Sequence, residues 1–287
     1  MNAHLLKLLT LAFFCICLVK PIYSQSPERD SSFSPYYVNY WVTGTICGVG
    51  ILVNSTGISN VMHKKDLTQS EMAGINRRAL NGFDSWALNL DPNQVKTYNG
   101  YSNNINMALI ASPTLLLFDK NIRHDWLDIL LMYTEVTFIT SNFFNYSFLG
   151  PSYQSRFRPI TYYNQLSYEE RRTGNNRNSF YSGHVASAAA ITFFMAKVYC
   201  DYNPQIGNNK YLIYAAAAVP PLITGYFRVK SLNHFPSDAM VGLAIGALMG
   251  IVIPEFHRIQ PDNLKLSFFS ENESTGISML WQPNFLK

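Results

Sequence analysis

Three separated stretches of the sequence carry side chains that together could transfer a phosphoryl group. They are Arg158; then Ser182, Gly183 and His184; and then Arg228, His234 and Asp238. Arginines bind phosphoryl oxygens, one imidazole can attack phosphorus, and a second imidazole can protonate the leaving oxygen. These residue types therefore predict phosphoryl transfer through a histidine.

Apolar segments of helical length must position these side chains. The segments are 36–53, 106–118, 126–148, 184–199, 211–227 and 238–253. We therefore expect an all-α fold, a bundle of about six core helices. Small residues in the last segment, such as Gly242 and Gly246, suit close packing against another helix.

The chemically active residues fall where apolar segments begin or end. In an antiparallel bundle the loops before the fourth and the sixth helix lie at the same end, so the three stretches should meet in one pocket there. The segment at 184 begins directly after Ser182, and the unpaired N–H groups of a helix start attract anions. We therefore expect an active site at one end of the bundle.

The composition favours a membrane protein or a mostly buried helical protein. Hydrophobic residues make up 48% of the 287 residues and charged residues only 14%, against about 25% in a typical soluble domain. The mean hydropathy of −0.01 is lower than that of a plain bundle of spanning helices. The net charge is +4 and the basic residues are scattered, so we expect no nucleic-acid partner.

The chain divides into four parts by composition. Residues 1–24 resemble a secretory signal peptide, or alternatively an uncleaved N-terminal anchor, and the Ser/Pro-rich residues 25–35 resemble a linker. The helical domain is expected at 36–258, with amphipathic surface helices in its polar part before 104. The C-terminal tail, 259–287, alternates polar and apolar residues, which predicts a short β-hairpin.

The cysteines and histidines give no metal-binding pattern. There is no CxxC or HExxH motif, so no metal site is expected. Cys47 and Cys200 lie in apolar surroundings, where we expect free thiols rather than a disulfide between them.

At the chemically active stretches the sequence resembles the type 2 phosphatidic acid phosphatase (PAP2) family, which shares its fold with bacterial class A acid phosphatases and vanadium haloperoxidases. The family pattern is Lys-x6-Arg-Pro, then Pro-Ser-Gly-His, then Ser-Arg-x5-His-x3-Asp. Here the blocks read Arg158-Pro159, Tyr181-Ser182-Gly183-His184 and Phe227-Arg228-x5-His234-x3-Asp238, in the family order. The resemblance covers roughly residues 104–258.

The sequence departs from the family pattern in three places. Pro151 stands where the lysine should be, which removes one cation for the phosphate. Tyr181 replaces the proline and Phe227 replaces the serine, which changes the frame of the site more than its chemistry. Arg156 could supply the missing charge, although capping helix carbonyls is the more common role of such an arginine.

The resemblance implies a role for each matching residue. His234 would be the nucleophile that forms a phosphohistidine, with Asp238 orienting its ring, and His184 would protonate the leaving oxygen. The phosphoryl oxygens would be held by Arg158, Arg228, Ser182 and the N–H group of Gly183. The mechanism implies no metal and no cofactor.

The resemblance therefore implies a metal-independent phosphatase of the bacterial cell envelope. Its substrate would be a phosphomonoester or pyrophosphate, above all a lipid phosphate in a membrane, with the active site facing the periplasm. The alternatives are a soluble periplasmic acid phosphatase of the same fold and a non-catalytic relative that binds phosphate or lipid, for which Pro151 speaks. A haloperoxidase is disfavoured, because loss of the lysine should also weaken vanadate binding.

Overall fold

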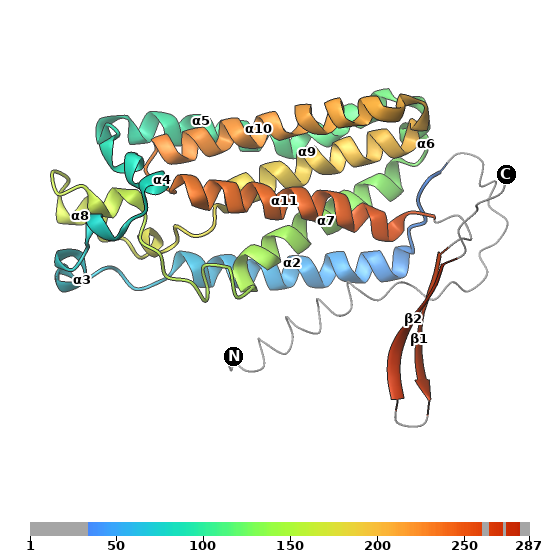
Figure 1. Cartoon of the computed structure of the whole chain (residues 1–287), viewed down its shortest axis with the longest axis horizontal. Coiled ribbons are helices and arrows are strands. Elements are labelled where there is room, and N and C mark those ends of the chain that lie inside the picture. Colours follow the sequence, from blue (N-terminus) through green and yellow to red (C-terminus); the bar gives the residue numbers. More distant parts are fainter. Residues whose placement is uncertain (1–33, 260–263, 272–273, 282–287) are drawn as a thin grey trace.

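The structure, a computed structural model, describes residues 34–259, 264–271 and 274–281. The signal peptide predicted at 1–24 and nearly all of the linker predicted at 25–35 lie outside these residues. The described part is a bundle of long helices with most of its short helices gathered at one end (Figure 1).

Six long helices form the bundle, as predicted. They are α2 (Tyr40–Met62), α5 (Val95–Ala111), α7 (Trp126–Tyr146), α9 (Gly183–Tyr202), α10 (Lys210–Lys230) and α11 (Pro236–His257). The short helices are α3 (Gln69–Ala73), α4 (Gly82–Ser85), α6 (Lys120–His124) and α8 (Tyr168–Arg171). Short 3₁₀ segments lie at Arg77–Ala79, Trp86–Asn89, Pro92–Gln94, Ser112–Phe118, Pro159–Tyr162, Gly174–Arg177 and Pro204–Asn209.

The second core helix lies earlier in the chain than predicted. The sequence placed it at 106–118, whereas α5 runs from Val95 to Ala111 and continues as a 3₁₀ segment. Pro113 ends the α-helical pattern because it has no N–H to donate. The first turns of α5 contain asparagines and lie in the polar part where surface helices were expected, but Asn99 and Asn103 line a cavity described below.

Helix α9 is the centre of the bundle and packs against α11, α10, α7 and α5, while α2 covers α7. The contact with α11 is the closest. A Cβ added at Gly242 would stand 2.6 Å from the Ser182 carbonyl oxygen, and one added at Gly246 would stand 2.1 Å from that of Ala186. Both distances are too short for a side chain, so the prediction of close helix packing by these glycines is confirmed.

The first turn of α11 is fixed by its own sequence. Pro236 occupies the first helical position, where its missing N–H costs nothing. Asp238, two residues on, accepts a hydrogen bond of 2.8 Å from the Phe235 N–H. Since α10 and α11 are joined by only a few residues, this cap also fixes the loop that carries His234.

Within the described residues, four helical segments are long and apolar enough to cross a membrane. They are Tyr40–Met62, Gly183–Tyr202, Pro204–Lys230 and Pro236–His257. Large apolar side chains on their outer surfaces are exposed, among them Leu52, Leu212, Leu222 and Leu248. A bilayer would cover such a surface, which supports association with a membrane.

The remaining sequence predictions concern the tail and the cysteines. Strands β1 (Leu264–Glu271) and β2 (Ser274–Trp281) pair antiparallel, from Leu264 opposite Trp281 to Glu271 opposite Ser274, so the predicted hairpin is present. Cys47 and Cys200 are free thiols, as expected.

Candidate active site

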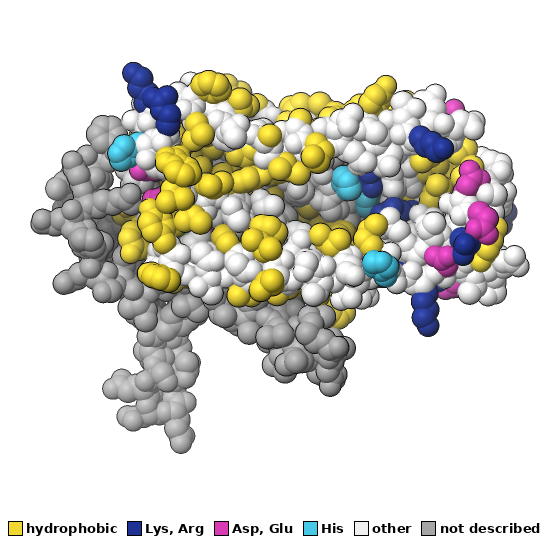
Figure 2. Space-filling model, turned by 180° about the vertical axis from the view of Figure 1, so that it is seen from behind, with side chains coloured by type: hydrophobic (Ala, Val, Ile, Leu, Met, Phe, Trp, Pro, Cys, Tyr) yellow, Lys and Arg dark blue, Asp and Glu magenta, His cyan; other side chains and the backbone are white. Residues whose placement is uncertain are grey.

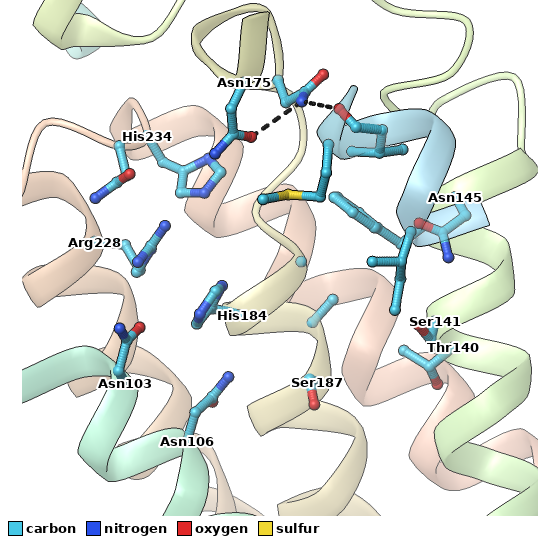
Figure 3. A pocket seen from close by; sticks show the side chains of 18 of the residues that line it. Asn103, Asn106, Thr140, Ser141, Asn145, Asn175, His184, Ser187, Arg228 and His234 are labelled. Atoms are coloured by element: carbon cyan, nitrogen blue, oxygen red, sulfur yellow. Dashed lines mark hydrogen bonds between the residues drawn. The ribbon is translucent and has the colours of Figure 1, made fainter. Parts of the chain in front are cut away.

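A cavity of about 500 Å³ lies between α2, α5, α7 and α9, close to the end of the bundle that carries the short helices. Arg158, His184, Arg228 and His234 all line it, although they come from different elements. Figure 3 shows His184, Arg228 and His234 together on one side of the cavity. The predicted convergence of the three stretches on one pocket is therefore found.

The His234 imidazole is buried and held in one orientation. Its Nδ1 lies 2.6 Å from the carbonyl oxygen of Ser179. A carbonyl can only accept, so Nδ1 carries the proton and Nε2 keeps its lone pair. Burial lowers the pKa of His234 well below its usual value, and the nearby cations of Arg228 and Arg158 lower it further. The ring is therefore neutral and nucleophilic at physiological pH.

The Asp238 carboxylate is connected to His234 through Ser179, and its i,i+4 spacing from His234 does not bring the two side chains into direct contact. Its buried carboxylate accepts hydrogen bonds from the Ser179 hydroxyl, at 2.6 Å, and from the Phe235 N–H. Ser179 in turn offers its carbonyl to the imidazole. Because Pro236 starts the helix between His234 and Asp238, the two side chains meet through Ser179.

Arg156 lies behind the cavity, outside the residues that line it. Its guanidinium forms ion pairs with Asp238 and with Asp84, the latter at 2.7 Å, and stacks over the Phe235 ring at 4.5 Å. Burial lowers the pKa of Arg156, but the two carboxylates outweigh that effect and leave it raised. This geometry does not favour the hypothesis that Arg156 replaces the missing phosphate cation.

The cavity arginines have neutral partners. Arg158 donates to the side-chain oxygen of Asn233 at 3.0 Å, and Arg228 donates to that of Asn99 at 2.7 Å. Asn233 also donates to the side-chain oxygen of Asn99, at 3.3 Å. These two hydrogen-bonded amides therefore accept from both guanidinium groups. Burial lowers the pKa of Arg158 to about 10, which still leaves it charged at neutral pH. Two uncompensated cations therefore border the same cavity as His234.

The start of α9 meets the cavity as predicted. Ser182 is its N-cap and makes no side-chain cap hydrogen bond, so N–H groups of the first turn stay available. Gly183 and His184 line the cavity. Ser182 does not line it, but its hydroxyl is fully buried and has no hydrogen-bond partner in the described part of the chain. A rotation of that hydroxyl toward an anion would give it a partner.

Pro151, at the place of the family lysine, is itself in contact with a lysine. The ammonium group of Lys64 donates to the carbonyl oxygens of Pro151 and Gln154. Lys64 does not line the cavity, however. The Lys64 ammonium group therefore lies beside Pro151, but it is bound to backbone carbonyls and does not reach the cavity. The positive charges at the cavity are those of Arg158 and Arg228.

Sequence reasoning missed the residues that hold the motif in place. Asn99, Ser179 and Asn233 carry its hydrogen bonds, and Asp84 binds both Arg156 and the N–H of Ser237. Asn99 and its neighbours Asn103 and Asn106 recur at helical spacing, and all three line the cavity. That spacing was a usable signal. No such signal identified Asp84, because it lies in the short helix α4, far in the sequence from Arg156 and Ser237.

The cavity opens sideways, between α2 and α5. Ile58 and Met62 on α2 and Asn103 on α5 line it and are also exposed on the outer surface. Figure 2 shows histidine and basic side chains in a hollow of this face, bordered by hydrophobic side chains. A ligand with an apolar part could thus reach the cations from the side of the bundle.

The chain was compared with protein-family models, curated proteins and solved structures. No curated protein matches the chain. A structure titled "Crystal structure of the first transmembrane PAP2 type phosphatidylglycerolphosphate phosphatase from Bacillus subtilis" is similar with a TM-score of 0.41 and 16% identity, over 75% of this chain and 94% of that one. The family model of the PAP2 superfamily matches residues 126–261. The matched residues hold all three motif stretches of the site, so the resemblance to this superfamily lies in the part of the chain that forms the cavity.

Proposed function

We propose that this protein is a phosphatase that hydrolyses a phosphomonoester or pyrophosphate, above all a lipid phosphate, through a phosphohistidine and without a metal. The observation that carries the proposal is the state of His234. It is neutral, fixed through Nδ1, and shares a cavity with two arginines whose side-chain partners are neutral amides. Such a site attracts a phosphate dianion and presents a lone pair to its phosphorus.

In the first step, Nε2 of His234 attacks phosphorus and the bond to the leaving oxygen breaks. Arg158 and Arg228 bind the phosphoryl oxygens, together with N–H groups at the start of α9, and stabilise their charge in the transition state. His184, protonated once the negatively charged phosphate is bound beside it, gives that proton to the leaving oxygen, so the product departs as an alcohol and the ring becomes neutral.

In the second step, water attacks the phosphorus of the phosphohistidine and the P–N bond breaks. His184, now neutral, takes the proton of that water. Inorganic phosphate leaves and His234 regains its lone pair. Asp238 and Ser179 keep the imidazole in the same orientation through both steps.

The lipid part of the proposal rests on the sideways opening and on the outer surface. The opening is bordered by exposed Ile58 and Met62, and α2 is itself one of the helices apolar enough to cross a membrane. A phosphate group could enter between α2 and α5 while its hydrocarbon chain stays outside in the bilayer. A soluble substrate would not require such a border.

The test is phosphate release by the purified protein in detergent, with phosphatidic acid, a prenyl pyrophosphate and an aryl phosphate as substrates. A chelator is present throughout, and His234→Ala is the control. We expect chelator-resistant release that disappears in the variant, and a phosphorylated histidine detected by mass spectrometry after a rapid alkaline quench. Release that the chelator abolishes would contradict the metal-free mechanism.

The departure at Pro151 gives the alternative of a non-catalytic phosphate- or lipid-binding protein. In that case, folded protein would bind inorganic phosphate but release none from any substrate. A preference for the aryl phosphate, with no need for detergent, would instead indicate the soluble acid phosphatase.

We further propose a location in the bacterial cell envelope with the active site facing the periplasm, on the family resemblance. Reporter fusions in the 150–178 loop would test the orientation. A reporter active only in the cytoplasm would overturn it.

A further inference from the structure

A second cavity, of about 160 Å³, lies between α10 and α11. Among the described residues, its lining has no member in common with that of the active-site cavity. Val229 of α10 lines it, whereas its sequence neighbour Arg228 lines the active site, so the two cavities lie on different sides of α10. We call the second cavity the α10–α11 groove.

The lining of the groove is apolar or aromatic. Its floor is formed by the buried residues Val185, Gly225 and Ala239. Its rim includes the exposed side chains of Leu222 and Met240. In another protein, an apolar cavity of about 150 Å³ stays free of water and binds benzene. Hydrocarbon is therefore the chemistry that this groove suits.

The groove opens onto the surface that a bilayer would cover. Both α10 and α11 belong to segments long and apolar enough to cross a membrane, and Leu222 and Met240 are exposed on their outer surfaces. Trp86 and Tyr226, which also line the groove, are exposed as well, and these residue types are enriched where hydrocarbon meets water. Because the groove continues the surface of two membrane-length helices, the molecules that meet it are lipids, whose hydrocarbon chains match its lining.

One end of the groove is bordered by a segment from elsewhere in the chain. Phe83 lies in α4 and Trp86 begins the 3₁₀ segment that follows, and both line the groove. Figure 1 shows α4 beside the ends of α10 and α11. Asp84, next to Phe83, is buried and instead binds the Ser237 N–H, at 3.0 Å, and Arg156. The segment thus presents aromatic rings to the groove and a carboxylate to the residues behind the active site.

We propose that the α10–α11 groove binds one hydrocarbon chain of a bilayer lipid, and that this chain holds α4 in place against the bundle. The bound lipid is structural and is not the substrate, because the groove is lined by none of the active-site arginines and histidines. The inference goes beyond the proposed function, since the binding requires no hydrolysis.

The test is a titration of delipidated protein in detergent with dioleoyl phosphatidylcholine, followed by native mass spectrometry. The phosphate of this lipid is a diester, so the lipid lies outside the proposed substrate class. The variant is Met240→Trp, which adds bulk at the rim of the groove. Met240 is 51% exposed, so the replacement leaves the core intact. We expect one bound lipid per natural chain, and an affinity about tenfold lower in the variant.

The matched control is Leu248→Trp. Leu248 lies about two turns further along α11 and is 57% exposed, but it does not line the groove. This variant should bind the lipid as the natural protein does, whereas Leu222→Trp, at the other side of the rim, should repeat the loss. Equal weakening by Met240→Trp and Leu248→Trp, or no bound lipid in the natural protein, would overturn the groove as a lipid site.

Hydrogen exchange tests the effect on α4. We expect the backbone amides of residues 82–89 to exchange more slowly with the lipid present, in the natural protein and in Leu248→Trp but not in Met240→Trp. Exchange that the lipid leaves unchanged in the natural protein would contradict the holding of α4. A dimer that Met240→Trp dissociates would show a second copy in the groove and would overturn the proposal.

The same titration of His234→Ala separates this proposal from the phosphatase. That variant should bind the lipid and protect residues 82–89 as the natural protein does, even if no substrate is ever hydrolysed. Loss of the lipid in His234→Ala would place the lipid in the active-site cavity and contradict the groove.

Discussion

The two ends of the helical bundle both contain buried charges, but they pair them in opposite ways. At the end of α9 far from the cavity, Lys197 is 6% exposed and binds Asp201 and Glu255, the latter at 2.7 Å. At the cavity end, Arg158 and Arg228 are bound only by neutral groups among the described side chains, the amides of Asn233 and Asn99 and the Ser102 hydroxyl. At the far end, carboxylates of the protein neutralise the lysine. At the cavity end, the arginines have no carboxylate partner and can bind an anion.

The same contrast separates two arginines that are close neighbours in sequence. Arg156 is bound by Asp84 and Asp238, whereas Arg158 faces the cavity with Asn233. The lesson is that arginine content alone does not identify an anion site. What distinguishes the two residues is the charge of their partners, because a carboxylate cancels the attraction for phosphate and an amide does not.

The largest effect is expected from His234→Gln. Glutamine can still hydrogen-bond but cannot form a phosphohistidine, so kcat for phosphate release should fall by about 10³-fold or more. The measurement is single-turnover release with saturating substrate. Asp201→Ala, at the opposite end of the bundle, is the control and should leave kcat unchanged. A residual rate within tenfold of the natural one would contradict the nucleophile assignment.

Asp201→Ala should instead lower stability. It removes a carboxylate that binds both Lys197 and the Tyr36 hydroxyl, the latter at 2.6 Å. Breaking a buried ion pair from one side costs about 3–5 kcal/mol, and Glu255 still compensates part of the Lys197 charge, so we expect about 3 kcal/mol. Thermal unfolding in detergent checks it. An unchanged midpoint of thermal unfolding would mean that the ion pair of Lys197 with Asp201 does not stabilise this end of the bundle.

Arg158→Lys and Arg228→Lys should each lower kcat/KM by about 10²-fold, since lysine keeps the charge but loses the planar fork. Their stability should change little, because no carboxylate is left without a partner. Arg156→Lys should show the reverse pattern, with more loss of stability than of activity. A similar profile for all three arginines would remove the distinction between Arg156 and Arg158.

The smallest effect concerns pH. The pKa of His234 is lowered in the folded protein, so below about pH 6.5 the unfolded chain binds a proton that the folded chain does not. Stability should therefore fall as pH drops, by about 1 kcal/mol per unit between about pH 6 and pH 5. His234→Gln should lose that part of the slope. An identical slope in both proteins would indicate a charged His234.

The sequence was sufficient for the core helices other than α5 and for the active-site motif, because both depend on local patterns. Apolar periodicity located the core helices, and the spacing of Arg228, His234 and Asp238 located the pocket at one end. It was insufficient where distant segments supply partners. The link from Asp238 to His234 runs through Ser179, and the partner of Arg156 is Asp84 in α4, which no spacing along the chain reveals.

The glycines of α11 have a genetic consequence. Gly242 and Gly246 touch the backbone of α9 just behind Ser182 and His184, and every amino-acid replacement there adds at least one carbon atom where none fits. A random mutational screen for loss of function should therefore recover these codons as often as those of the histidines. Their variants would differ by making little folded protein, so abundance measured beside activity would separate the two kinds of hit.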